Sequence, residues 1–214
     1  MALAKMTWDE LNELVGYEVS EPFDEYFAPM QISEEQKRKR VELAEELDAV
    51  FIALLSEYFY ADQLDAVVAS DIYDRTREAY LLAIGTAVEV DDYLYNHGVE
   101  VIASTIEVLL RHDDEPYFVS KDRARAIAEN ESNVVYEYDE LREAYEDGSR
   151  YKIWHTIIDG RERDSHAVMN GVKIPIDEPF ELAGGYMMTP HDDSLGVSTD
   201  ELANCRCSCS YTKK

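Results

Sequence analysis

The sequence lacks a long hydrophobic run. Its longest strongly apolar stretch covers about residues 49–55, far short of the roughly 20 residues that a membrane-spanning helix needs. The opening residues become acidic at once and contain no apolar signal core. We therefore expect a protein that is made in the cytoplasm and has no membrane partner.

Basic residues are scarce as well. The chain has 20 lysines and arginines against 46 aspartates and glutamates, which gives a formal net charge of −26. Such a charge repels phosphate backbones and anionic membranes. General contact with DNA is therefore not expected, whereas a basic protein surface or bound cations would suit the chain. Apolar residues make up 46% of the sequence, enough material for a folded core.

Cysteine is rare, and its distribution is unlike that of a disulfide framework. The chain has three cysteines, Cys205, Cys207 and Cys209, within five residues. An odd number of thiols at so close a spacing argues against paired bridges. A metal site or ordinary free thiols remain as the two interpretations.

Glycine and proline are absent between Met30 and Gly85, which leaves room for long helices. Ser33 begins a capping box, S-E-E-Q, in which serine and glutamine side chains satisfy early backbone amides. Beyond it, apolar residues recur at three- and four-residue steps to about Tyr60. This spacing predicts a first long helix with one buried face.

Further helices are expected along the next part of the chain. The second begins at about Gln63, and the sequence Asn96-His97-Gly98 indicates a break, with Gly98 as a left-handed helix cap. Other helices are predicted over residues 99–110 and from Ser120 to about Glu146. Residues 33–148 are therefore predicted to form a helical domain.

Residues 1–32 are expected to be an irregular N-terminal arm. The arm contains two prolines and several aromatic residues, which could anchor a contact. The arm either folds back on the protein's own core or is reserved for a partner. The sequence leaves both alternatives open.

The periodicity changes after residue 148, so we predict a small C-terminal unit over residues 149–214. Residues 151–158 form a strand pattern with apolar residues on both faces. Asp159-Gly160 and Asn170-Gly171 are turn signals around a short helix, and Pro175 places a short strand at a sheet edge. The sequence NCRCSCSY predicts a final strand. The fold class is therefore α+β, a mostly helical N-terminal body followed by a small mixed C-terminal unit.

The three cysteines would line one side of that final strand, because residues two apart point to the same face. His166 and His191 are the imidazoles of this region that could complete a metal site. Two thiolates with one or two imidazoles suit a structural zinc ion, which would help to fold a unit with little core of its own. The alternative is that the cysteines are buried free thiols that pack as small apolar groups.

A second cluster comprises Asp159, Glu162 and His166. On a helix these residues are spaced i, i+3 and i+7, so they would share one face. Two carboxylates beside an imidazole can bind a divalent metal or perform acid–base catalysis. They can equally form a hydrogen-bonded structural cluster, which is the interpretation we favour. No phosphate-binding glycine loop and no nucleophile elbow is present in the sequence.

The C-terminal third, about residues 120–211, resembles the Mu F-like phage head morphogenesis proteins, the minor capsid proteins encoded next to the portal gene. The resemblance begins with a lead-in over residues 123–132. The residues that carry it are Trp154, Asp159, Arg163, His166, Gly171, Glu178-Pro179-Phe180, Pro190 and Asn204-Cys205-Arg206-Cys207. Their order and spacing together make the resemblance fairly specific, whereas the N-terminal helices are not diagnostic.

The resemblance implies a structural role rather than an enzyme. Such proteins are present in a few copies in each particle, near the portal vertex of the virion head, and are linked to procapsid assembly, DNA packaging or DNA delivery. The expected partners are the portal protein and, in addition, a major capsid or scaffolding protein. The family positions favour zinc bound by His166, Cys205 and Cys207, with Cys209 and His191 as further ligand candidates.

The resemblance also suggests a structural network of Trp154, Asp159, Arg163, Gly171 and Asn204 around the site. Two other function classes remain open from the sequence. One is a metal-dependent hydrolase or injected effector that uses Asp159, Glu162 and His166. The other is an adaptor whose main interaction surface is the acidic helical body.

Overall fold

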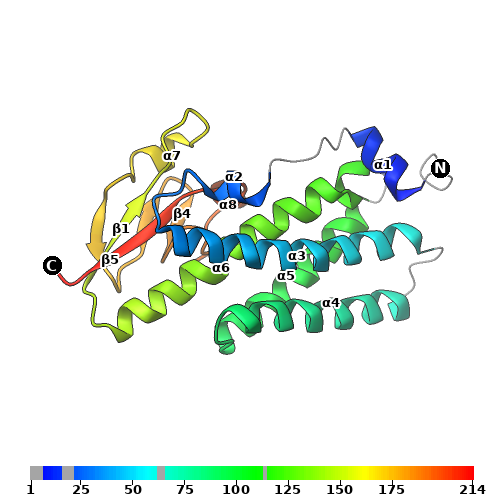
Figure 1. The fold of residues 1–214 in the computed structure, drawn as a ribbon, viewed down its shortest axis with the longest axis horizontal. Helices are drawn as coiled ribbons and strands as arrows, with labels where there is room; N and C mark the ends of the chain where they lie inside the picture. Colours follow the sequence, from blue (N-terminus) through cyan, green and yellow to red (C-terminus); the bar gives the residue numbers. More distant parts are fainter. Residues whose placement is uncertain (1–6, 16–21, 62–65, 113–114) are drawn as a thin grey trace. The chain divides into compact units, whose positions relative to one another are not determined.

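The computed structural model of the chain describes residues 7–15, 22–61, 66–112 and 115–214. In chain order, its elements are α1 (Trp8–Val15), α2 (Phe23–Phe27), α3 (Glu34–Tyr60), α4 (Ala66–Ala87), α5 (Asp92–Arg111), the 3-10 helix η2 (Pro116–Val119), α6 (Lys121–Glu146), β1 (Tyr151–His155), α7 (Asp164–Ala167), β2 (Lys173–Pro175), β3 (Phe180–Leu182), β4 (Gly185–Met187), α8 (Thr199–Leu202) and β5 (Ser208–Thr212). Long helices precede a small antiparallel sheet region (Figure 1), which confirms the predicted α+β class. Within the described ranges, none of the helices is both long and apolar enough to cross a membrane.

Contacts divide the chain into two compact units. The helical unit comprises residues 1–21 and 42–129, and the mixed unit comprises residues 22–41 and 130–214. This division passes through α3 and α6, which each contribute residues to both units. Because the two units are not consecutive stretches of the chain, the domain boundary at residue 148 suggested by the sequence stays a prediction.

In the helical unit, the predicted break at Asn96-His97-Gly98 is wrong, because α5 runs without interruption from Asp92 to Arg111. Gly98 is buried in the middle of this helix. A Cβ atom at Gly98 would lie 2.8 Å from Cε1 of Tyr80 in α4. Glycine therefore permits two helices to approach closely rather than ending one. The predicted start of the second helix at Gln63 lies outside the described residues.

The expectation that residues 1–32 are irregular is also wrong for the described part, which contains α1 and α2. The Trp8 indole in α1 donates a 2.7 Å hydrogen bond to the Val119 carbonyl oxygen, within the helical unit. Phe23 and Phe27 in α2 are buried, and the Tyr26 hydroxyl donates to the Cys205 carbonyl oxygen at 3.2 Å within the mixed unit. These aromatic residues therefore pack against the protein's own chain.

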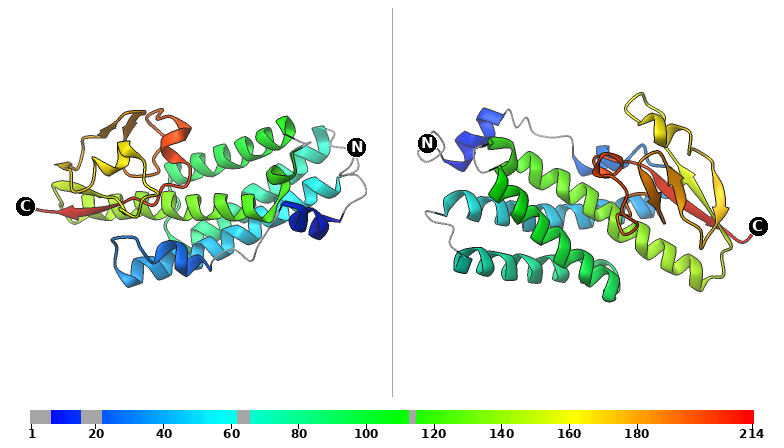
Figure 2. Two further views of the ribbon diagram at one scale, coloured as in Figure 1. Left: turned by 90° about the horizontal axis from the view of Figure 1, so that it is seen from above. Right: turned by 180° about the vertical axis from the view of Figure 1, so that it is seen from behind.

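A three-stranded antiparallel sheet organises the mixed unit, with the strand order β2-β1-β5. Trp154 of the central strand lies opposite Cys209 of β5, and the predicted edge strand with Pro175 is β2. A separate hairpin pairs β3 with β4. The C-terminal part of α6 packs against this region (Figure 2), because Leu141 and Ala144 contact Ile176 and Tyr211.

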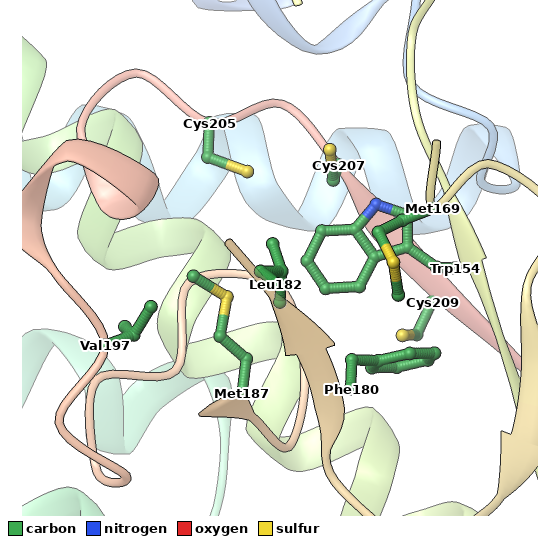
Figure 3. Packing of buried hydrophobic residues seen from close by; sticks show 9 residues of the cluster. All are labelled: Trp154, Met169, Phe180, Leu182, Met187, Val197, Cys205, Cys207 and Cys209. Carbon is green, nitrogen blue, oxygen red and sulfur yellow. The ribbon is translucent and has the colours of Figure 1, made fainter. Parts of the chain in front are cut away.

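The two faces of β1 differ in burial. Lys152 and Trp154 are fully buried, whereas the alternate residues Tyr151, Ile153 and His155 are half-buried. The Lys152 ammonium group donates to the Met188 carbonyl oxygen at 2.6 Å. The main core of the mixed unit, shown in Figure 3, consists of Trp154, Met169, Phe180, Leu182, Met187, Val197, Cys205, Cys207 and Cys209. All three cysteines therefore belong to the core.

Candidate metal centre

The short helix α7 carries His166 into the core. A turn with Gly160 at φ 86° precedes the helix, and the His166 backbone amide donates to the Arg163 carbonyl oxygen at 3.0 Å. The His166 residue is only 2% exposed. Its ring lies edge-on to the Trp154 indole, with 5.5 Å between the ring centroids. The position of the imidazole is therefore fixed by both backbone and packing.

The segment after α8 delivers two thiols to the same place. Asn204 adopts a left-handed conformation with φ 54°, which asparagine tolerates better than most residues. The next residue, Cys205, donates its amide to the Leu202 carbonyl oxygen at 3.1 Å. Strand β5 begins only at Ser208, so Cys205 and Cys207 lie in the turn and the approach to the strand. The prediction that all three cysteines lie on one face of a strand is therefore wrong.

The structure brings His166, Cys205 and Cys207 together. Their donor atoms lie within 4.8 Å of one another, and all three residues are buried. His166 Nδ1 lies 3.6 Å from Cys205 Sγ and 3.4 Å from Cys207 Sγ. A tetrahedral zinc ion, with Zn–N of about 2.0–2.1 Å and Zn–S of about 2.3 Å, would hold its nitrogen and sulfur ligands about 3.6 Å apart. The two nitrogen–sulfur distances therefore match the spacing that a zinc ion requires.

The protonation of the two thiols is also suited to metal binding. A hydrogen bond from Cys205, together with the contact to His166, lowers the pKa of Cys207 to about 5. The same hydrogen bond and burial raise the pKa of Cys205 well above its ordinary value. The lowered pKa favours the thiolate form of Cys207, and thiolate is the form that binds metal. A bound cation would favour loss of the second proton as well.

Glu201 in α8 lies at the other nitrogen of the imidazole. Its Oε2 is 2.9 Å from His166 Nε2, although the contact lies outside hydrogen-bond geometry. The same oxygen accepts a 2.8 Å hydrogen bond from the Ser165 hydroxyl. Carboxylates commonly orient metal-binding histidines by accepting a hydrogen bond from the outer ring nitrogen, and Glu201 lies close enough to do so after a small rotation. Sequence reasoning missed Glu201. The pattern Ser198-x-x-Glu201 has the form of a helix capping box, but Ser198 makes no side-chain cap, so the carboxylate is available to the imidazole.

Two predicted network residues, Trp154 and Gly171, hold the site from the side of β1. The Trp154 indole donates to the Thr156 hydroxyl at 3.0 Å, and that hydroxyl donates to the His166 carbonyl oxygen at 2.7 Å. Gly171 has φ 82°, and its amide donates to the Trp154 carbonyl oxygen at 2.8 Å. These contacts fix the turn after α7 against the central strand.

Other network residues connect the turn before α7 to the cysteine segment. The Asp159 carboxylate accepts a hydrogen bond from the Arg206 guanidinium group at 2.9 Å, and Asp159 also pairs with Arg161. Arg163 donates to the Ala203 carbonyl oxygen. The charged residues of the predicted network therefore link the segment that carries His166 to the segment that carries the thiols.

The other two ligand candidates lie outside the three-residue cluster. His191 is buried, and its Nε2 lies 3.3 Å from the Cys207 carbonyl oxygen, a backbone contact. Burial lowers the pKa of His191 to about 3, so the ring is neutral. Burial likewise raises the pKa of the Cys209 thiol well above its ordinary value. Figure 3 shows Cys209 beside Phe180, whereas Cys205 and Cys207 lie at the edge of the core.

The shared helical face expected for Asp159, Glu162 and His166 is not formed. Helix α7 begins only at Asp164, so the first two residues lie in the preceding turn. Glu162 accepts hydrogen bonds from the Asp159 and Gly160 amides at 3.0 and 2.7 Å. Both carboxylates therefore stabilise the turn, while the imidazole faces the two cysteines.

A buried ion network lies next to the cysteine segment, and no pattern in the sequence indicates it. Arg40, fully buried, pairs with Glu137 at 3.2 Å and with Glu140 at 2.8 Å. The Cys209 amide donates to Glu137 Oε2 at 3.2 Å. Burial raises the pKa of Glu137 well above its ordinary value, and Arg40 opposes this shift. The network connects α3, α6 and β5 within the mixed unit.

Comparison with known proteins decides the family. The model of the phage Mu protein F like family matches residues 96–210, which is more than half of the 214-residue chain. The chain belongs to the phage Mu protein F like family. Searches of curated proteins and of solved structures found no match. The matched range contains His166, Cys205, Cys207 and Glu201, so the whole candidate centre lies in the part that defines the family.

Membership of this family confirms the resemblance seen in the sequence. It points to a phage head morphogenesis protein that is associated with the virion. The three-residue cluster adds that a metal could be held in the mixed unit.

Proposed function

We propose that the protein is a minor head protein that docks on the portal and acts in procapsid assembly, DNA packaging or DNA delivery. The observation that carries this proposal is the family match over residues 96–210. We further propose a position near the portal vertex in a few copies per particle, after synthesis in the host cytoplasm. A major capsid or scaffolding protein is proposed as an additional contact.

The charge of the chain supports a protein partner rather than DNA. A net charge of −26 repels the phosphate backbone and would steer the protein towards a basic surface. The enzyme alternative has no comparable support, because Asp159 and Glu162 hold a turn together. A structural role is therefore the function that the geometry supports best.

Co-expression with the portal protein of the same phage tests this proposal. The complex would be isolated by size-exclusion chromatography with mass detection, at low and at high salt. We expect a stable complex that weakens as salt rises, because exposed charges are screened. The portal protein of an unrelated phage is the control. Absence of a complex even at low salt, or equal binding to both portals, would contradict the proposed role.

We also propose that the metal is zinc, held by His166, Cys205 and Cys207. Thiolate and imidazole are the ligands that zinc prefers in proteins. Zinc would link α7 to the segment after α8, and it would stabilise the part of the mixed unit that packs around Trp154 and the cysteines. The bound ion would supply charge neutralisation for the buried thiolate pair.

Paired cysteine variants test the zinc proposal. Cys207→Ala removes a ligand, whereas Cys209→Ala removes a thiol of the same core outside the cluster. We expect Cys207→Ala to make the mixed unit sensitive to limited proteolysis and to abolish the stabilising effect of added zinc. Cys209→Ala should keep the response to zinc. If Cys207→Ala melted and responded to zinc like the wild type, the zinc proposal would fail.

A further inference from the structure

The three-residue cluster is one ligand short of a closed zinc site. Structural zinc sites have four protein ligands, whereas sites with three protein ligands leave one position for another molecule. Among the described residues, the group of donor atoms that lie within 4.8 Å of one another contains only His166, Cys205 and Cys207. Within the described part of the chain, a fourth ligand would require a rearranged side chain, and the alternative is a ligand from outside the chain.

Neither additional ligand candidate is placed to close the site. His191 has φ 71°, and its ring contacts the Cys207 backbone and Asn130. Turning this buried ring towards the thiols would break both contacts. Cys209 is held in the sheet opposite Trp154, and its amide is bonded to Glu137. Bringing its sulfur to the cluster would require the strand register to change.

The Glu201 carboxylate lies on the side of the imidazole away from the two thiols. Glu201 contacts His166 Nε2, whereas both sulfur atoms face Nδ1. The two ring nitrogens direct their lone pairs away from each other, so an ion bound at Nδ1 would be separated from Glu201 by the ring. Glu201 is therefore placed to orient the imidazole and to select its tautomer.

A small cavity borders all three donors. It offers about 20 Å³ to the centre of a water molecule, and about 10–15 Å³ is enough for one water. Its polar lining consists of the three ligands together with Thr156, Arg161, Glu162, Arg163, Asn204 and Arg206. Glu162 is held by the turn amides, and its carboxylate is not among the donor atoms grouped within 4.8 Å. The cavity is thus polar, partly cationic and large enough for a water molecule or a small anion.

We propose that the centre has three protein ligands and an exchangeable fourth ligand, a water molecule or small anion, that occupies this cavity. In this arrangement, Glu201 is a positioning residue and neither His191 nor Cys209 binds the metal. The inference rests on the proposed metal site and deepens it. It assigns the centre to the class of sites that can accept an outside ligand rather than to closed structural sites.

Cobalt substitution of the full-length protein tests the inference. Co²⁺ would be titrated into chelator-treated protein, and its visible spectrum would give first the stoichiometry and then the coordination. We expect one equivalent to bind with a tetrahedral spectrum that includes thiolate charge-transfer bands. Azide should then change the spectrum in a saturable manner, because it replaces the fourth ligand. A tetrahedral spectrum that azide does not change would overturn the inference while leaving the metal site intact.

X-ray absorption of the zinc-loaded protein gives the donor set independently. We expect two sulfur atoms at about 2.3 Å and two nitrogen or oxygen atoms at about 2.0–2.1 Å. Three sulfur atoms would show that Cys209 is recruited and would contradict the inference. If the protein bound neither cobalt nor zinc, the proposed zinc site and this inference would both fail. The number of metal ions bound per chain distinguishes this result from a closed site, which would still bind one ion.

Two variants separate a ligand from a positioning residue. Glu201→Gln should weaken metal binding about 10- to 100-fold while preserving the cobalt spectrum and its response to azide. Loss of the tetrahedral spectrum in this variant would show that Glu201 is itself a ligand and would overturn the assignment. Glu181→Gln is the matched control, because Glu181 is an exposed carboxylate of β3 that does not line the cavity. It should leave both affinity and spectrum unchanged.

Discussion

The buried guanidinium group of Arg40 gives the sharpest prediction about stability. Arg40 and Glu137 are both fully buried, whereas the side chain of Glu140 is 12% exposed. Removing one partner of a buried ion pair costs about 3–5 kcal/mol, because the other charge stays buried without compensation. We therefore expect Arg40→Met to destabilise the mixed unit by about 3–5 kcal/mol. Glu140→Gln should cost less, about 1–2 kcal/mol, because its side chain is partly exposed and Glu137 still pairs with Arg40.

A double variant isolates the charge effect from the loss of packing. Replacing Glu137 by leucine in the Arg40→Met background removes the stranded charge, so part of the lost stability should return. The recovery of stability will be incomplete, because the Cys209 amide and the Asn133 amide oxygen lose their hydrogen-bond partners. Each buried group left without a partner costs about 1–3 kcal/mol.

Urea unfolding followed by tryptophan fluorescence measures these effects. The chain has two tryptophans, and a Trp8→Phe background leaves Trp154, which lies in the core of the mixed unit, as the reporter. If Arg40→Met cost less than about 1 kcal/mol, or if the double variant were less stable than the single one, the assigned role of the network would be refuted.

The remaining predictions concern a histidine and two glycines. The pKa of His191 in the folded protein is about 3, well below its ordinary value. The contribution of the neutral ring to stability should therefore be fully present above about pH 6.5 and be lost as the pH falls towards 3. In the His191→Asn variant, measured with chelator present, the urea midpoint should vary less with pH. Gly171→Ala should cost about 1–2 kcal/mol in thermal melts, because φ is 82° and the cost is conformational; Gly171→Asn should cost less. Gly98→Ala should destabilise the helical unit by about 1–3 kcal/mol through its clash with Tyr80, which a lower melting temperature would show. A His191→Asn variant with the pH dependence of the wild type would contradict the first prediction. Equal costs for Gly171→Ala and Gly171→Asn would contradict the second, and a Gly98→Ala variant that melts like the wild type would contradict the third.

Local patterns were sufficient to predict the parts of the fold that depend on neighbouring residues. The periodicity and the capping box at Ser33 predicted the first long helix, and the box is formed, because the Gln36 amide donates to the Ser33 hydroxyl at 3.2 Å. The glycine turns around α7 were predicted from residue type alone. The pairing of His166 with two cysteines followed from ligand chemistry and from the family pattern.

Features that depend on distant contacts could not be predicted in this way. Gly98 has the local signature of a helix end, and only the proximity of Tyr80 explains why it lies inside α5. Arg40 and Glu137 are 97 residues apart in sequence, so nothing local indicates that they pair. The alternation of the cysteines predicted a shared face, but that rule holds only inside a strand, and β5 begins after Cys207.

The metal content of the purified chain tests the central claim, that a His166, Cys205 and Cys207 centre organises the mixed unit of this phage head protein. The protein would be purified without chelator, loaded with zinc, desalted and measured by mass spectrometry of the metal. We predict one zinc ion per chain in the wild type and in Cys209→Ala, and none in Cys207→Ala. A wild-type chain that retains no metal, or a Cys207→Ala chain that retains the same amount, would contradict the account.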